Sequence, residues 1–90
     1  MSVHCVLEIQ NVRGLHARAA SAFVKEADRF KADIWVEKDG QRVSGRSIMG
    51  LMMLAAAKGT TIDVFCDGDD EADAQQALEA LVNAKFNEES

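Results

Sequence analysis

The segment Gly14-Leu15-His16-Ala17-Arg18-Ala19-Ala20 organises the rest of the chain. A glycine permits a sharp backbone turn, and the alanine-rich run after it predicts a helix with His16 at or beside its first residue. The first backbone N–H groups of a helix have no intrahelical partner, and the helix dipole is positive there. We therefore expect a neutral imidazole with a ring nitrogen free to attack. The backbone N–H groups of Ala17 and Arg18, with the Arg18 guanidinium, would hold an anion placed on that ring.

A nucleophile beside anion donors suggests a histidine that carries a phosphoryl group. An ordinary surface histidine near a helix cap is the alternative. The short segment alone favours neither, because histidine has no single default role in proteins. The rest of the chain has to decide between them.

The length of 90 residues predicts one small domain, residues 1–90. The net charge of −5 argues against general binding to nucleic acid or anionic membranes. Trp35 falls on a solvated strand face without a basic patch, so it does not indicate stacking on bases. No apolar run is long enough to span a bilayer and no signal peptide precedes the first strand, so we expect a cytoplasmic protein.

The two cysteines, Cys5 and Cys66, are far apart and have neither C-x-x-C spacing nor clustered histidines. We expect buried reduced thiols rather than a disulfide or a zinc site. The acidic run Asp67-Gly68-Asp69-Asp70 lacks the ligand spacing of a calcium loop. No phosphate-binding loop of the G-x-x-x-x-G-K-[ST] type is present either, so we expect no metal and no cofactor.

Alternation of apolar and polar residues predicts four strands. They cover Val3 to Ile9, Asp33 to Lys38, Gln41 to Ser44 and Thr60 to Cys66, and Asp39-Gly40 indicates a hairpin between the second and third. His4 lies on the outer side of the first strand, where a solvated histidine is expected.

Helical spacing predicts helices from His16 to about Phe30, from Ser47 to about Ala56 and from about Glu71 to Phe86. Ser47 should cap the second helix and Gly59 should close it. Its buried stripe should comprise Ile48, Leu51, Met52 and Ala55, with Met49 and Met53 on the flank. The final residues 87–90 should fray. The order β-α-β-β-α-β-α predicts a two-layer α/β sandwich whose sheet has one polar face.

Two motifs together resemble the HPr family. The first is Gly14-Leu15-His16-Ala17-Arg18 before a small-residue helix, and the second, about 30 residues later, is Gly45-Arg46-Ser47-Ile48-Met49 at the start of another helix. Members of this family are the histidine-containing phosphocarriers of the bacterial phosphoenolpyruvate-dependent phosphotransferase system. The resemblance covers essentially the whole chain. The run Gly50-Leu51-Met52-Met53-Leu54 is most similar to the nitrogen-related and other regulatory branches. The resemblance also implies an antiparallel sheet in the order 1-4-2-3, covered on one face by three helices.

The resemblance further implies the roles of particular residues. His16 would be phosphorylated on Nδ1, with Arg18 closing over the phosphoryl oxygens. Ser47 would be the position that a dedicated kinase/phosphorylase modifies in some branches. Ile48 and Met49, joined by Met52, would meet enzyme I as donor and a IIA-type protein as acceptor, and we expect a monomer.

Ala19 is a departure from the family pattern, which has proline there, and this puts the rigidity of the site in question more than its existence. A phosphocarrier loaded by a partner protein, rather than a free-standing enzyme, is the leading hypothesis. The alternative is a regulatory binding module controlled by Ser47 phosphorylation. A hydrolase with His16 as base has little support, because no nucleophile is placed to pair with it.

Overall fold

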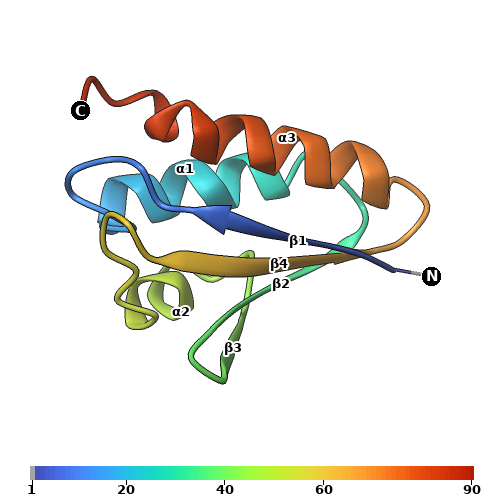
Figure 1. Ribbon diagram of the computed structural model, residues 1–90. Coiled ribbons are helices and arrows are strands. Elements are labelled where there is room, and N and C mark those ends of the chain that lie inside the picture. The colour runs from blue at the N-terminus through green and yellow to red at the C-terminus, as the bar shows by residue number, and fades with distance from the viewer. Residues whose placement is uncertain (1) are drawn as a thin grey trace.

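The computed structural model describes residues 2–90 as a four-stranded sheet with helices packed against it (Figure 1). In chain order the elements are β1 (Ser2–Glu8), α1 (Ala17–Ala27), β2 (Asp33–Lys38), β3 (Gln41–Ser44), α2 (Ile48–Met53), β4 (Thr61–Asp67), α3 (Glu71–Asn83) and a short 3₁₀ turn, η1 (Lys85–Asn87). The predicted β-α-β-β-α-β-α order is confirmed.

The strands lie in the order β1-β4-β2-β3, and all three pairings are antiparallel. Val64 of β4 lies opposite Cys5 on one side and Val36 on the other, so the central strands bring their apolar residues to the same face. This confirms the 1-4-2-3 order that the family resemblance implied.

The inward face of the sheet and two helices form the core. α1 and α3 lie across that face, and α2 packs against α1 and β3 (Figure 1). The small residues Ala19 and Ala20 of α1 are buried, but the backbone of α1 approaches α2 and α3 more closely than any strand, so the close approach to the sheet expected from the sequence is not found. The buried residues include Leu7, Ile9, Ile34, Val36, Ile62, Val64 and Cys66 from the sheet region, and Ala19, Ala20, Phe23, Ala27, Ala74, Leu78 and Val82 from the two helices. Cys66 is buried, Cys5 is half-buried, and both are free thiols. Among residues 2–90, no helix is both long and apolar enough to cross a membrane.

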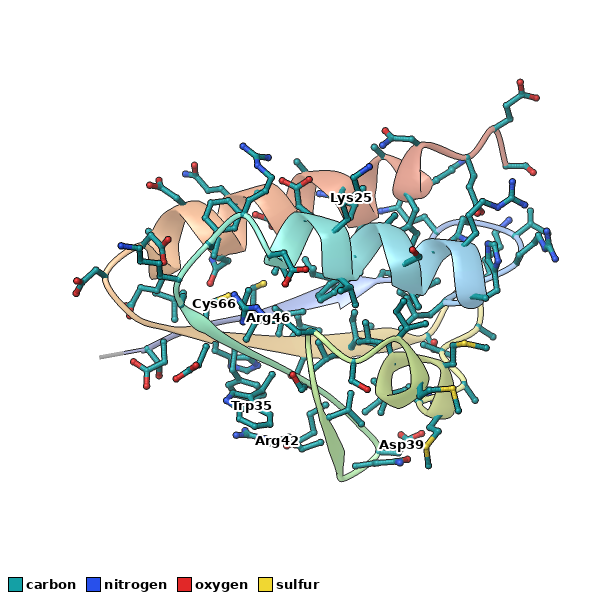
Figure 2. All side chains as sticks on the ribbon, turned by 180° about the vertical axis from the view of Figure 1, so that it is seen from behind. Lys25, Trp35, Asp39, Arg42, Arg46 and Cys66 are labelled. Atoms are coloured by element: carbon teal, nitrogen blue, oxygen red, sulfur yellow. The ribbon has the colours of Figure 1, made fainter. Side chains whose placement is uncertain are left out.

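Within residues 2–90, no helix covers the outward face of the sheet, which carries stacked side chains. The His4 ring stacks on Phe65 with centroids 4.3 Å apart, and its Nε2 lies 2.8 Å from Oδ1 of Asp63. The guanidinium of Arg42 also lies over the Phe65 ring, 4.5 Å from its centroid. Trp35 and Arg42 project from the sheet away from α1 and α3 (Figure 2). His4 is therefore exposed, as expected, but it is paired.

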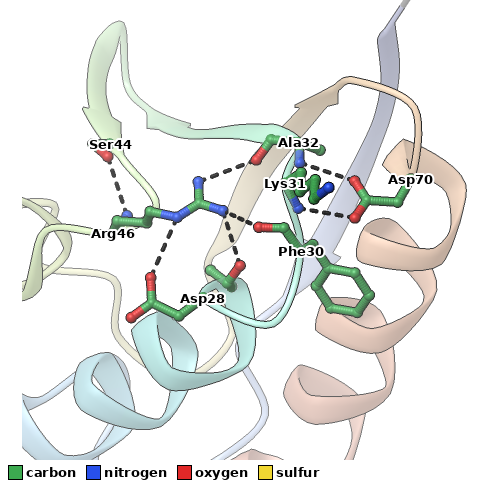
Figure 3. Close-up of polar contacts among 8 residues, drawn as sticks. Asp28, Phe30, Lys31, Ala32, Ser44, Arg46 and Asp70 are labelled. Carbon is green, nitrogen blue, oxygen red and sulfur yellow. Dashed lines mark hydrogen bonds and ion pairs between the residues drawn. The ribbon is translucent and has the colours of Figure 1, made fainter.

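Two side chains tie the loop between α1 and β2 in place (Figure 3). The Arg46 guanidinium donates to the backbone carbonyls of Ala27, Phe30 and Ala32 at 2.6–3.1 Å and lies 3.3 Å from the Asp28 carboxylate. From the other side, the two Asp70 carboxylate oxygens accept the backbone N–H groups of residues 31 and 32. Carbonyls at a helix end need donors, and here a cation supplies them. α1 ends at Ala27, whereas the sequence predicted a helix to about Phe30.

α2 is shorter than predicted and its buried face is narrower. It ends at Met53 rather than near Ala56, because the chain turns into a left-handed conformation at Ala55 (φ 52°). Of the predicted stripe only Leu51 is buried, whereas Ile48 is 39% and Met52 40% exposed, and Ala55 is exposed too. The prediction of a four-residue buried stripe was wrong, since a helix of this length presents only about one turn to the core.

Gly59 does not cap α2, in contrast to the prediction. It lies in the turn before β4 with φ +89°, and its N–H donates to the carbonyl of Ile9 at 2.8 Å. Gly59 therefore links the entry to β4 with the exit from β1.

Candidate phosphoryl-transfer site

His16 occupies the N-cap position of α1, as the sequence predicted. Its backbone is extended (φ −78°, ψ −179°), and its carbonyl accepts the first helical hydrogen bond, from Ala20 N–H at 2.8 Å. Gly14, with φ +67°, makes the turn that delivers it. A Cβ on Gly14 would lie 2.5 Å from the carbonyl oxygen of Ala56, so the close approach of two loops requires glycine.

The start of α1 offers anion donors beside the ring. The N–H groups of Ala17, Arg18 and Ala19 precede the first helical bond, and no side chain caps them. Such N–H groups and the positive helix end bind phosphate oxygens. The Arg18 side chain is exposed and, within residues 2–90, forms no hydrogen bond or ion pair. It is therefore available to an incoming anion.

One hollow borders the histidine, and a second lies beside Arg18. One, of about 270 Å³, is lined by Arg13, Leu15, His16, Ala55, Ala56 and Ala57. The other, of about 370 Å³, lies between Arg13, Arg18 and the segment Phe86, Asn87, Glu88, Glu89 and Ser90. His16 lines only the first of these hollows, and its side chain is 16% exposed, so most of the ring is covered.

The end of the chain reaches the site, which contradicts the prediction that residues 87–90 fray. Glu88 places Oε2 2.5 Å from Nε2 of His16, and its Oε1 accepts Nδ2 of Asn11 at 2.9 Å. Burial alone would raise the pKa of Glu88. The hydrogen bonds from Asn11 and His16, together with the positive charge of Arg18, instead hold that pKa below its ordinary value. Glu88 is thus a carboxylate in contact with the ring.

Sequence reasoning missed Asn11 and Glu88. Asn11 is fully buried, and its Nδ2 also donates to the carbonyl of Gly14 at 2.8 Å, so it braces the turn before His16. The only signal was an amide residue directly after a strand, which is equally typical of any turn. For Glu88 there was no local signal, because its partner is 72 residues away.

The predicted partner surface forms part of the same end of the molecule, although it does not touch the ring. α2 lies beside the start of α1 (Figure 1). Met49 is 71% and Met53 64% exposed, and the half-exposed Ile48 and Met52 adjoin them. The Ser47 hydroxyl accepts the N–H of Gly50 at 2.9 Å, which confirms its predicted role as an N-cap.

Comparison with known proteins agrees with this geometry. A family model described as "PTS HPr component phosphorylation site" matches residues 3–84. The phosphocarrier protein HPr of Neisseria meningitidis is 56% identical over 82 residues, which cover 91% of this chain and 92% of that protein. The HPr-like protein Crh of Halalkalibacterium halodurans is 47% identical over 84% of this chain and 90% of its own.

Among solved structures, an HPr from Thermoanaerobacter tengcongensis superimposes with a TM-score of 0.93 at 44% identity, covering 98% of this chain and 99% of that one. The sequence match and the structural match therefore extend over nearly the full length in both directions. The chain belongs to the HPr family, the phosphocarrier proteins of the phosphotransferase system.

Proposed function

We propose that His16 is the residue on which this phosphocarrier holds the phosphoryl group. One observation carries this assignment: the ring stands at the uncapped start of α1, beside three backbone N–H groups without helical partners and an unpaired Arg18 guanidinium. The phosphoryl group would bond to the ring while these donors balance its charge. Arg18 presents a planar fork of donors, which suits phosphate oxygens.

The donor and the acceptor follow from the family. HPr proteins are general components of the phosphotransferase system, and we infer that enzyme I loads His16 and that a IIA-type protein unloads it. The exposed apolar patch of α2 (Ile48, Met49, Met52 and Met53) supports docking near His16, because large exposed apolar side chains grouped on one helix are typical of interaction surfaces. The cytoplasmic location expected from the sequence, the monomeric state and the single domain over residues 1–90 belong to the same proposal.

A regulatory role is the second candidate, and Ser47 supports it. The hydroxyl lies at the start of α2, next to the exposed Ile48 and Met49. A phosphate there would place about −1.5 to −2 charges beside an apolar docking patch. One of the similar solved structures is named a catabolite repression protein, which agrees with regulation by a member of this fold. Assignment to the nitrogen-related branch stays a prediction.

Incubation with enzyme I and phosphoenolpyruvate tests the central assignment. The wild-type protein should gain one acid-labile, base-stable phosphate, and the His16→Ala variant should gain none. His4→Ala is a matched control, since His4 is the only other histidine and lies on the outward face of the sheet. Labelling of the His16→Ala protein at the wild-type rate would refute the assignment. If Ser47 modification changed the labelling rate but the labelled protein passed its phosphate to no acceptor protein, the regulatory binding module would be favoured.

A further inference from the structure

The C-terminal segment, residues 84–90, contains an unfavourable backbone conformation. Lys85, Phe86 and Asn87 have φ values of 57°, 56° and 63°, a left-handed conformation that non-glycine residues seldom adopt. Three such residues in succession persist only where surrounding contacts impose them. Phe86 supplies one contact, since its side chain is 5% exposed. The side chain of Glu88 supplies two more, to Asn11 and His16.

Glu88 joins the histidine to the loop that delivers it. One carboxylate oxygen lies 2.5 Å from Nε2 of His16, and the other accepts the amide of Asn11 at 2.9 Å. The same Asn11 nitrogen donates to the carbonyl of Gly14, two residues before the ring. The His16 and Glu88 side chains are each only 16% exposed, so water competes weakly for this contact. The connection therefore fixes both the position and the orientation of the ring.

The contact also determines which ring nitrogen can react. An ionised carboxylate only accepts hydrogen bonds, so the nitrogen facing it must carry a proton. In a neutral imidazole with its proton on Nε2, the lone pair lies on Nδ1. We propose that Glu88 is a positioning residue that holds His16 in the Nε2–H tautomer, directs Nδ1 toward the phosphoryl donor and stabilises the positive ring that forms during transfer.

This inference rests on the proposed role of His16 and accounts for the charge during the reaction. As the Nδ1 lone pair forms the bond to phosphorus, the bond between phosphorus and the donor breaks, and its electron pair leaves with the donor. The Nε2 proton stays in place, so the ring becomes cationic opposite the Glu88 carboxylate. A hydrogen bond that strengthens as charge develops lowers the barrier rather than merely binding the ground state. When the group is passed on, the same steps run in reverse.

Substitutions at position 88 separate the hydrogen bond from the charge. Glu88→Ala removes both, whereas Glu88→Gln keeps a side-chain oxygen that can accept from Nε2 but carries no charge. Glu89→Gln is the matched control, because it removes the same charge from the exposed neighbouring residue. We expect Glu88→Ala to slow the initial rate of His16 phosphorylation about tenfold, Glu88→Gln to fall between it and wild type, and Glu89→Gln to react as wild type. Thermal melting of each variant shows whether it is folded.

A second measurement does not depend on transfer at all. Nitrogen-15 NMR of the unphosphorylated protein reports the tautomer of each histidine ring, and we expect His16 to be protonated on Nε2 in wild type and to lose this preference in Glu88→Ala. A wild-type ring with its proton on Nδ1, or a Glu88→Ala variant that is labelled as fast as wild type or faster, would overturn the inference. Failure of the wild-type protein to accept phosphate would instead refute the proposed function, and the tautomer measurement distinguishes these cases.

Discussion

Arg18 and Arg46 show how differently two arginines of one small protein are used. Arg46 is engaged by three backbone carbonyls and a carboxylate, whereas Arg18 is exposed and, in the part of the chain that the structure describes, makes no hydrogen bond or ion pair. A side chain that makes no hydrogen bond or ion pair in the resting protein contributes little to its stability. Any contact that Arg18 makes with a phosphoryl group can therefore stabilise the transfer step without loss of a contact in the resting protein.

Replacement of Arg18 should therefore separate transfer from folding. We expect Arg18→Ala to slow His16 phosphorylation about ten- to a hundredfold, because one charged hydrogen-bond donor is lost from the phosphoryl group, while the melting temperature stays unchanged. Arg18→Lys retains the charge but not the planar fork and should be intermediate. The initial labelling rate with enzyme I, set beside a melting curve, checks both statements. An equal rate in Arg18→Ala would exclude this guanidinium from the site.

Ala19 is the residue at which this chain departs from the family's usual proline. Its N–H lies before the first helical hydrogen bond, so a proline would remove no bond. We expect Ala19→Pro to change the free energy of unfolding by no more than about 1 kcal/mol, in the stabilising direction if the buried ring is accommodated. Urea denaturation measures this. A loss well beyond that amount would mean that the tight packing around Ala19, which is 1% exposed, rejects the ring.

At the scale of elements, α2 combines a capped N-terminus with an exposed apolar face. Ser47 caps its N-terminus, and the neighbouring Ile48 and Met49 are exposed. Aspartate is also a good N-cap, and a negative charge is favourable at a helix start. The same charge must lose water when a partner covers the patch. Modification at Ser47 should thus affect docking and folding in opposite directions.

We accordingly expect Ser47→Asp to leave the melting temperature unchanged or slightly raised and to increase the enzyme I concentration needed for half-maximal labelling of His16. Gln41→Asp is the control, since it changes the charge by the same amount on the exposed β2–β3 hairpin. Titration of enzyme I against the initial labelling rate is the measurement. If the two variants behave alike, α2 is not part of the docking surface and Ser47 acts only as a cap.

The clamp at the end of α1 gives a prediction about stability alone. Without the Arg46 guanidinium, the carbonyls of Ala27, Phe30 and Ala32 lose their donor (Figure 3). We expect Arg46→Met to lower the free energy of unfolding by about 2 kcal/mol, since a charged donor is lost and water replaces only part of its bonds. Arg29→Met, at an exposed arginine of the same helix end, is the control. An unchanged unfolding midpoint would show that water satisfies these carbonyls fully.

At the scale of the whole molecule, two carboxylates link distant parts of the chain and make its stability depend on acid. Hydrogen bonds from the backbone N–H groups of Lys31 and Ala32 outweigh burial and lower the pKa of Asp70, as Asn11, His16 and Arg18 do for that of Glu88. A lowered pKa in the folded state means that the stabilising contribution is complete above the pKa of the unfolded chain. It disappears as the pH falls through the lower pKa of the folded state.

The melting temperature should therefore fall in acid, below about pH 4, and Asp70→Asn should reduce part of that dependence. At neutral pH the same variant should melt at a lower temperature than wild type, because one of the two backbone N–H groups then faces an amide nitrogen that cannot accept and the other keeps only a neutral acceptor. Asp69→Asn, at an exposed neighbour, is the matched control. Melting curves recorded from neutral pH downward test this. A curve for Asp70→Asn parallel to that of wild type would assign the acid sensitivity to other groups.

The sequence predicted the strands, the hairpin and the place of His16 because these depend on local patterns. Alternation placed Val36 and Val64 inward, and Asp39-Gly40 marked the turn to within a residue. Contacts between distant segments were not predicted. The three carbonyls held by Arg46 lie 14 to 19 residues before it, and nothing in the residues around Lys85, Phe86 and Asn87 signals three left-handed conformations in a row. Glu88 was consequently assigned to a frayed end, although it contacts the histidine.

The position of Glu88 has a practical consequence for anyone who produces this protein. β1 begins at Ser2, at the end of the sheet far from His16, whereas the segment after α3 finishes beside the start of α1 (Figure 1). An affinity tag or a fused fluorescent domain attached after Ser90 would begin three residues after Glu88, whose carboxylate contacts the ring. Its linker would compete with a docking protein for space. A fusion before Ser2 would leave the end of the molecule that carries His16 unobstructed. Transfer rates measured on carboxy-terminally tagged material would then report the tag as well as the protein.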